Sequence, residues 1–321
     1  MTHHFITGIA GFIGSQLADA LLASGHRVSG IDDLSLGRRA FLHDAGKSAL
    51  FRFSVADCSS PDAAEAALAQ ACDWGGTPDL VWHLAANSDI AAGVADLGID
   101  YARTVGTTFG LLQAARACGV TRIAFASTSA VYGERDGLLT EDSGPLLPIS
   151  NYGATKLASE ALLSAAAESF LERLWIFRFP NVVGPRATHG ALHDFLARLG
   201  DDPARLVVLG DGCQTKPYMH VSELIAAMGF IVEMAQERRN VFNIGPEGAG
   251  TSVAFMAQQT ALRAAPGAEI AYTGGDRGWL GDVPRFALST QRLGRLGWRP
   301  ELTSDAAVLR TIDELVAARN G

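Results

Sequence analysis

The sequence has no block of basic residues and no apolar run of membrane-spanning length, and its formal net charge is −8. Nucleic-acid binding usually needs a clustered positive surface, and a spanning helix needs about 20 apolar residues in succession. We therefore expect neither nucleic acid nor a membrane as a partner. The N-terminus also lacks a basic segment followed by a cleavable apolar one, so we expect a cytoplasmic protein.

Paired cysteines and clustered histidines are absent as well. The four cysteines are scattered and form no C-x-x-C pair, and the eight histidines show no ligand spacing. This favours buried or incidental thiols over disulfides and predicts no metal site. His3 and His4 precede the first expected strand and look like a terminal accident. No internal repeat or low-complexity linker occurs in the 321 residues.

Strand and helix patterns alternate through the first 180 residues, and nearly half of all residues are apolar (48%). This alternation predicts a Rossmann-type α/β fold, a doubly wound parallel sheet with ligand space at the carboxyl ends of its strands. The expected strands are Phe5–Thr7, Val28–Ile31, Leu50–Val55, Leu80–Leu84, Arg122–Ser127 and Trp175–Phe179. The expected helices are Ile13–Ala23, Pro61–Ala71, Ala92–Ala117 and Tyr152–Leu171.

Glycine and proline become dense beyond Asn181, for example at Gly184, Pro185 and Gly190. We expect residues 1–180 to form a dinucleotide-binding domain, to which residues 221–246 return. The remainder of 181–321 should form a smaller C-terminal α/β domain that covers the ligand space and binds the substrate.

The most informative stretch runs from Phe5 to Asp32. A short apolar strand meets Gly8, Gly11 and Gly14, a helical pattern follows, and a second apolar run ends on Asp32, 18 residues after Gly14. Such glycines allow a tight turn and a close approach of a pyrophosphate to the backbone at a helix N-terminus. Taken alone they could be turn and C-cap residues, but the flanking strand, helix and acid favour a dinucleotide. A carboxylate at Asp32 repels a 2′-phosphate, which favours NAD over NADP.

A second pattern carries chemistry. Tyr152 and Lys156 are four residues apart and therefore share one face of a helix, and Thr128 ends an upstream strand. A tyrosine acts as a base near neutral pH only if its pKa falls by roughly 3 units, or about 4 kcal/mol. A lysine ammonium one turn away and an oxidised nicotinamide can together provide this. Tyr-x-x-x-Lys alone is common by chance, but behind a hydroxyl-rich strand end it indicates a catalytic Thr128, Tyr152 and Lys156 set.

The glycine spacing G-x-x-G-x-x-G resembles the extended short-chain dehydrogenase/reductase superfamily. Across nearly the whole chain, further motifs resemble its nucleotide-sugar epimerase/dehydratase branch, most closely the UDP-glucose (UDP-galactose) 4-epimerases. These motifs are TGIAGFIGS, HLAAN, STSAVYGE, NYGATK, FRFPNVVGPRATHG, GDGCQTKPYMHV, FNIG and RGWLGDV.

The resemblance implies a mechanism without an external redox partner. Tyr152 removes the proton from the C4 hydroxyl of the sugar while hydride passes to NAD⁺, and the 4-keto sugar turns before hydride returns to its other face. Branch members that dehydrate or decarboxylate carry acids just after the catalytic hydroxyl. Ser129 and Ala130 occupy those positions here and cannot act as acids or bases at neutral pH, which favours epimerisation.

The same resemblance implies further binding residues. For the cofactor they are Gly8, Gly11, Phe12, Ile13, Gly14, Asp32, Asp33, Leu34, Ser35, Gly37, Asp57, Cys58, Leu84, Ala85, Ala86, Ser127, Tyr152, Lys156 and Phe179. For the substrate they are Ser88, Thr128, Ser129, Asn181, Leu209, Lys216, Tyr218, Arg277 and Asp282.

Several of these positions have a second interpretation. Asp57 either meets the adenine or belongs to the N-cap region before Pro61. Lys216 either contacts phosphate or is a solvated charge. Arg277 either reaches the diphosphate or pairs with Asp276. Arg103 replaces an asparagine that the family commonly has, and Phe286 is either a gate against N-acetyl groups or a core residue. His189 is assigned no role.

Three other activities stay open: an epimerase of another nucleotide sugar such as UDP-glucuronate, a reductase that consumes NAD(P)H, and a non-catalytic NAD-binding regulator. An acidic substrate would need an extra cation near the sugar. The helices Ala92–Ala117 and Tyr152–Leu171 carry apolar residues beyond one face. Because the family pairs equivalent helices in a four-helix bundle, we expect a homodimer.

Overall fold

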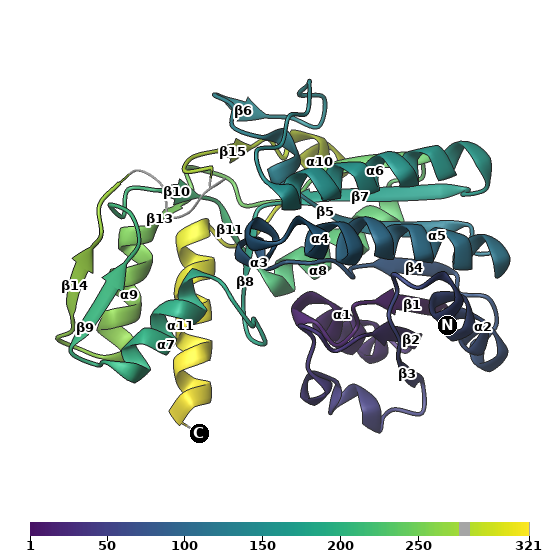
Figure 1. Cartoon of the computed structure of the whole chain (residues 1–321), viewed down its shortest axis with the longest axis horizontal. Coiled ribbons are helices and arrows are strands. Elements are labelled where there is room, and N and C mark those ends of the chain that lie inside the picture. Colours follow the sequence, from purple (N-terminus) through teal and green to yellow (C-terminus); the bar gives the residue numbers. More distant parts are fainter. Residues whose placement is uncertain (276–282, 321) are drawn as a thin grey trace.

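Seven parallel strands form the central sheet of the computed structural model, in which residues 1–275 and 283–320 are described. Their order across the sheet is β12-β7-β5-β4-β1-β2-β3 (Figure 1). The strands are β1 (His3–Thr7), β2 (Arg27–Asp32), β3 (Phe51–Val55), β4 (Leu80–His83), β5 (Arg122–Thr128), β7 (Arg173–Phe179) and β12 (Arg239–Asn243). The predicted fold class is confirmed.

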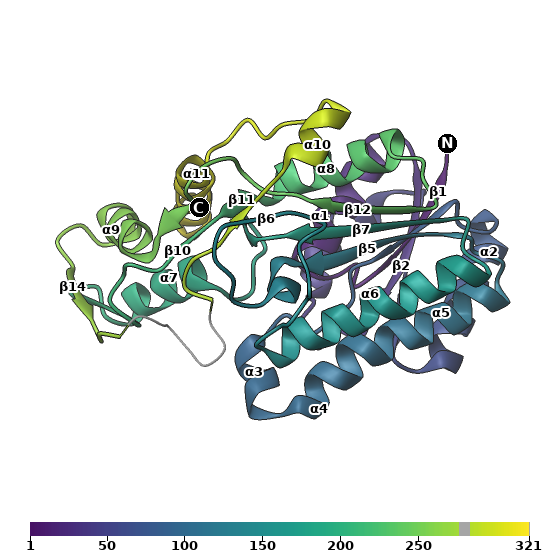
Figure 2. The ribbon, with the colours of Figure 1, turned by 90° about the horizontal axis from the view of Figure 1, so that it is seen from above.

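Helices cover both faces of this sheet, as the edge-on view in Figure 2 shows. One face packs against α1 (Phe12–Ala23), α8 (Val221–Met234) and α10 (Gln291–Leu296), through residues such as Leu17 and Met228. The other packs against α2 (Pro61–Gly75), α5 (Thr107–Ala117) and α6 (Asn151–Ser169), through residues such as Leu68. Because both faces are covered, the strands are apolar along their length rather than alternating.

The segment predicted as one helix, Ala92–Ala117, is divided in the structure. It consists of α3 (Ile90–Ala95), α4 (Leu97–Asp100), a π-helical turn η3 (Tyr101–Gly106) and then α5. The physical reason lies at Asp96, which is extended (φ −143°) and whose side chain caps the next helix by accepting from the Gly98 N–H. A continuous apolar pattern therefore hid a break that a short acidic cap produces.

A second apolar core lies outside the central sheet. It joins α7 (Ala191–Asp201), β9 (Arg205–Val208), α9 (Val253–Ala264), β14 (Glu269–Tyr272) and α11 (Ser304–Asn320), with Phe195, Met256 and Val308 buried inside. These elements stand apart from the sheet in Figure 1, on the side where the strands end. Short pairs connect the two bodies: β8 (Asn181–Val183) with β11 (Tyr218–His220), β10 (Thr215–Lys216) with β13 (Thr251–Ser252), and β6 (Leu138–Leu139) with β15 (Ala287–Leu288).

The two N-terminal histidines are structural, so their dismissal as a terminal accident was wrong. His3 begins β1, is buried, and bonds to the Gly76 carbonyl (2.8 Å) and the Ser29 hydroxyl (2.7 Å). His4 accepts from the Trp82 indole N–H (3.2 Å), and burial lowers the pKa of its imidazole to about 4. A sequence pattern gave no warning, because the partners come from distant elements.

Candidate active site

A cavity of about 550 Å³ lies at the carboxyl ends of the sheet strands. The predicted site residues that line it are Gly8, Gly11, Phe12, Ile13, Gly14, Asp32, Asp33, Ser35, Gly37, Asp57, Cys58, Leu84, Ala85, Ala86, Ser88, Ser127, Thr128, Ser129, Tyr152, Lys156, Phe179, Asn181, Lys216 and Tyr218. They come from strand ends far apart in the sequence. The topology therefore brings both predicted groups of residues, for cofactor and for substrate, to one cavity.

Two predicted residues are not on the cavity wall. Leu34 packs against the core beneath the sheet, and Leu209 is 47% exposed. Their inclusion rested on position in a motif, which does not fix the direction of a side chain. Arg277 and Asp282 lie outside the described residues, as does the proposed Asp276 partner.

The glycine loop between β1 and α1 has no room for side chains. Gly8 has φ +72°, a region that L-residues rarely adopt, and a Cβ on it would approach the Ala85 nitrogen to 2.9 Å. A Cβ on Gly14 would overlap the Gly8 carbonyl oxygen. The first turn of α1, with Phe12 and Ile13, lines the cavity directly behind this loop. The loop thus presents bare backbone at a helix N-terminus, which fits the pyrophosphate of a dinucleotide.

Asp32 ends β2 and closes this part of the cavity. Its carboxylate accepts from the Ala10 N–H (2.9 Å) and the Leu34 N–H (2.8 Å). Burial raises the pKa of this carboxyl, and the two N–H donors oppose the rise. Each carboxylate oxygen keeps a further acceptor position, so the arrangement is compatible with ribose hydroxyl donors.

Asp57 satisfies parts of both interpretations. Its carboxylate accepts from the Ser59 N–H (2.8 Å) and hydroxyl (2.7 Å), while the N-cap of α2 is Ser60. Asp57 also lines the cavity, as the adenine interpretation requires. Burial raises the pKa of the neighbouring Cys58 thiol to about 12, so this cysteine is an unreactive wall residue.

Thr128, Tyr152 and Lys156 meet at the centre of the cavity. Thr128 ends β5, and its hydroxyl is hydrogen-bonded to Tyr152. Tyr152 and Lys156 occupy the first two turns of α6, whose N-cap Ser150 accepts from the Gly153 N–H (3.1 Å). Burial raises the pKa of Tyr152, the bond from Thr128 opposes the rise, and Asp100 adds to it. The protein alone therefore keeps the phenol protonated at neutral pH.

Lys156 is 3% exposed and donates from Nζ to the Ala126 carbonyl oxygen at 2.7 Å. Its Nζ also lies 4.7 Å from the centre of the Phe125 ring. Burial lowers the pKa of Lys156 to about 7, and Glu160 on the same helix opposes this decrease. A lysine poised near neutrality beside a tyrosine is typical of a functional site rather than of a structural ion pair.

Other cavity residues were left open or missed by the sequence reasoning. Arg103, from the π-helical turn η3, lines the cavity, and so does Phe286, which also packs against Tyr132 and Leu139 in a small apolar cluster. Asn87 and the start of α7 line it without having been predicted. Asn87 is the last residue of the HLAAN motif and was the one recoverable signal. Among the described residues, no group of three potential ligands could hold a metal, and no helix could cross a membrane.

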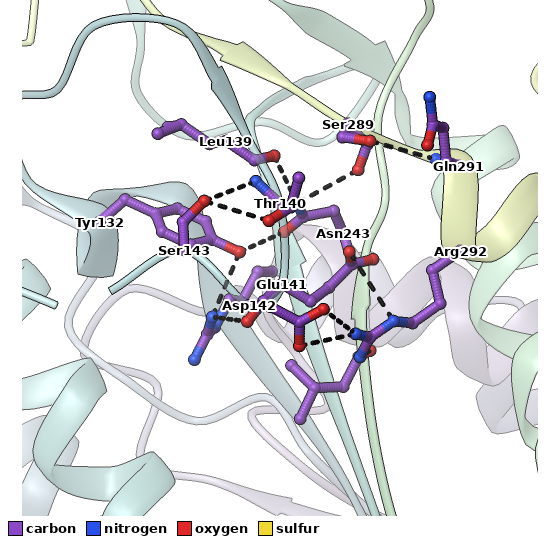
Figure 3. A network of polar contacts seen from close by, with 12 residues as sticks. Tyr132, Leu139, Thr140, Glu141, Asp142, Ser143, Asn243, Ser289, Gln291 and Arg292 are labelled. Carbon is purple, nitrogen blue, oxygen red and sulfur yellow. Dashed lines mark hydrogen bonds and ion pairs between the residues drawn. The ribbon is translucent and has the colours of Figure 1, made fainter. Parts of the chain in front are cut away.

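A polar network supports the cavity wall from behind (Figure 3). Tyr132 donates to the Asn243 side-chain oxygen (2.7 Å), and the Asn243 amide donates to the carbonyl oxygens of Leu139 (3.0 Å) and Ser289 (3.2 Å). The Glu141 carboxylate accepts from the Asn243 N–H (2.9 Å). Side chain and backbone of one residue thus fix the β6 and β15 strands next to the end of β12.

This geometry coincides with that of known proteins. The family described as the NAD dependent epimerase/dehydratase family matches residues 4–245, and the chain belongs to it. The UDP-glucose 4-epimerase of Mycolicibacterium smegmatis is 32% identical over 96% of both chains. A crystal structure of UDP-glucose 4-epimerase from Thermotoga maritima with UDP-glucose has a TM-score of 0.86 at 26% identity and covers 99% of both chains.

The structure of Thermus thermophilus UDP-glucose 4-epimerase in complex with NAD has a TM-score of 0.85 at 28% identity, covering 98% of this chain and 99% of that one. These matches confirm the expected superfamily branch, the enzyme class and the NAD cofactor. The likeness extends over both apolar cores, because the covered share leaves neither out.

Proposed function

We propose that this enzyme interconverts UDP-glucose and UDP-galactose by epimerisation at C4, with NAD retained in the cavity. The observation that carries the proposal is the hydrogen-bonded Thr128–Tyr152 pair, with Lys156 one turn further along α6, in the same cavity as the glycine loop. Relatives named UDP-glucose 4-epimerase, similar over the full length, support the substrate class.

The glycine loop and the N-terminus of α1 would hold the pyrophosphate of NAD, and Asp32 would accept from the adenosine ribose. Lys156 would donate to the nicotinamide ribose, and the small residues Ala85 and Ala86 let the backbone approach the cofactor. Bound NAD supplies the acceptor and donor of one hydride. Everything else in the reaction depends on the chain's own side chains.

Tyr152 takes the proton of the C4 hydroxyl and later returns it to the C4 oxygen. Because burial raises its pKa, the phenolate needs two positive neighbours, the Lys156 ammonium and the cofactor ring. Thr128 holds the same sugar oxygen in hydrogen-bond reach of Tyr152. Ser129 and Ala130 follow Thr128 on the cavity wall and offer no acid for an elimination step.

The second apolar core supplies the nucleotide side of the cavity. Asn181 and Lys216 line it and are proposed to contact the diphosphate, so that the sugar can turn while the nucleotide stays fixed. We assign residues 1–180 with 221–246 to NAD binding and most of 181–321 to the nucleotide sugar. Phe286 on the wall is the proposed gate against N-acetyl groups.

One observation favours a second candidate, a UDP-uronate 4-epimerase. Arg103 replaces a neutral residue common in the family and faces the cavity, so a cation is available for an acidic substrate. Substrate preference between UDP-glucose and UDP-glucuronate, measured in wild type and in Arg103→Asn, separates the two candidates.

We also propose a homodimer through α5, α6 and the preceding turns. Apolar side chains remain exposed there: Val94 (42%), Leu97 (58%), Tyr101 (64%) and Phe109 (49%). Such a contiguous apolar surface is typical of an interface. All four cysteines are free thiols, which agrees with a cytoplasmic location. Light scattering of wild type and of Tyr101→Ser/Phe109→Ser tests the dimer.

The decisive experiment follows the anomeric protons of a panel of nucleotide sugars incubated with pure enzyme and no added cofactor. Interconversion of C4 epimers without net NADH supports the proposal. Net oxidation or reduction indicates a reductase, and an absence of turnover with bound NAD indicates a regulator. Either of these two results contradicts epimerisation.

A further inference from the structure

Glu160 is a buried carboxylate to which neither the sequence motifs nor the proposed mechanism assigns a role. It is 5% exposed and lies one helical turn after Lys156 on α6. One carboxylate oxygen accepts from the Ser127 hydroxyl (2.5 Å) and from Arg178 Nε (3.0 Å), and the other accepts from an Arg178 terminal nitrogen (2.6 Å). Every bond of this carboxylate thus goes to the strand ends that border the cavity.

Lys156 needs such a neighbour because its own surroundings disfavour its charge. Its ammonium donates to a neutral carbonyl and is buried against Phe125. The ionisable groups on the elements around it are Tyr152 and Glu160 on α6, Arg178 on β7, His83 on β4, Tyr132 on η4 (Ser129–Tyr132), Asp100 on α4 and Arg103 on η3. Burial lowers the pKa of Lys156 to about 7, and among these groups Glu160 raises it.

We propose that Glu160 is a positioning residue of the active site, which keeps Lys156 protonated and holds the end of β5. The inference rests on the proposed function for the use made of Lys156. Its two parts share one carboxylate: the negative charge acts on the ammonium, and the hydrogen bonds fix Ser127, next to Thr128. Two geometrical requirements of catalysis thus depend on a side chain that does not line the cavity.

Arg178 fixes Glu160 in its turn. The guanidinium is 6% exposed, forms the two bonds to Glu160, and also donates to the Tyr132 hydroxyl (3.2 Å), over whose ring it lies at 5.0 Å. Tyr132 continues to Asn243 and so to the wall strands of Figure 3. The carboxylate is therefore held in one orientation by a fork of donors rather than by a flexible surface pair.

The titration of Lys156 can be observed directly, because the chain has only three lysines, Lys47, Lys156 and Lys216. Protein labelled at lysine with ¹³Cε and ¹⁵Nζ gives three signals, which Lys47→Arg, Lys156→Arg and Lys216→Arg assign. In Glu160→Gln we expect the midpoint of Lys156 to fall by about one pH unit or more. The matched control is Glu168→Gln, two turns further along α6 on the surface, which should leave the midpoint unchanged.

Two further variants separate charge from packing. Glu160→Asp keeps the charge and should restore most of the midpoint. Glu160→Gln/Arg178→Gln leaves no unpaired guanidinium, and its midpoint should stay below that of wild type. A midpoint that is unchanged in Glu160→Gln, or that returns to the wild-type value in the double variant, overturns the inference.

Activity provides the second measurement. The ratio of wild-type to Glu160→Gln kcat should increase between pH 5.5 and 8 to about tenfold, the factor that a shift of one unit produces. A ratio that does not vary with pH would mean that Glu160 is only structural. If wild type proves inactive on every nucleotide sugar, the proposed function fails, and the lysine titration still decides whether Glu160 sets the charge of Lys156.

Discussion

The hydroxyl of Tyr132 donates a 2.7 Å hydrogen bond to the side-chain oxygen of Asn243 across the buried end of the sheet. Tyr132 belongs to the turn after the catalytic strand β5, and Asn243 ends β12, which lies beyond β7 at the sheet edge. Since Asn243 also holds β6 and β15, this one bond connects the strand that carries Thr128 with the wall that carries Phe286.

Tyr132→Phe should therefore destabilise the protein by about 1–3 kcal/mol, because the Arg178 donor and the Asn243 acceptor lose a buried partner. Urea unfolding measures the change. Tyr272→Phe is the matched control, since Tyr272 is 40% exposed and its loss of a hydroxyl should alter the free energy of unfolding by less than about 0.5 kcal/mol. Equal effects of the two variants would contradict a structural role for the Tyr132 bond.

Tyr152→Phe should reduce kcat by about 10²–10⁴-fold, the usual contribution of a positioned acid–base group. NAD binding should be retained, because the glycine loop and Asp32 are unchanged. Turnover of UDP-galactose and the NAD content of purified protein provide the two measurements. Activity close to that of wild type would remove Tyr152 from the mechanism.

Gly14→Ala should weaken NAD binding by more than about tenfold and lower the melting temperature, because the added Cβ overlaps the Gly8 carbonyl oxygen and displaces the loop. Gly46→Ala is the control: Gly46 lies in the 3₁₀ turn η2 (Ala45–Lys47), where a Cβ meets nothing within 4 Å. Calorimetric titration of cofactor-free protein with NAD compares them. The prediction fails if both alanine variants bind NAD like wild type.

His83→Gln should reduce the loss of stability in mild acid. His83 is fully buried and bonds to the Thr7 (2.8 Å) and Thr108 (2.9 Å) hydroxyls, and burial lowers its pKa to about 3. The unfolded chain then binds a proton below pH 6.5 that the native state rejects, so stability is complete above this pH and falls as the pH decreases toward 3. From pH 7.5 to 5 this histidine should cost about 2 kcal/mol of stability.

Urea unfolding at pH 7.5 and 5 tests this prediction, with exposed His189→Gln as the control. The variant at position 83 should lose about 2 kcal/mol less than wild type over this interval. An equal loss in wild type and His83→Gln would show that the imidazole is protonated in the native state.

Much of the fold could be predicted because period and punctuation are local. Leu17 and its helical neighbours, the glycines before them and Asp32 after them lie within 30 residues, and each constrains the next. The break at Asp96 could not be predicted from apolar periodicity, because an extended residue with a capping carboxylate leaves that periodicity intact.

The candidate site divides in the same way. Tyr152 and Lys156 are fixed relative to each other by a helix, so their spacing alone placed them together. Leu209 failed because its direction depends on packing between strands rather than on the motif around it. Glu160 and Asn243 could not be found, since each acquires meaning only from partners 18 to 111 residues away.

The late arrival of β12 limits how this chain can be divided. A fragment that stops at residue 180 would lack the edge strand that pairs with β7, and the indole of Trp175 would lose the Ala235 carbonyl that accepts its hydrogen bond. An unpaired outer strand is a template for association with other chains. Exchange of substrate-recognition modules between relatives would therefore require two insertions, one before α8 and one after β12, rather than a single junction.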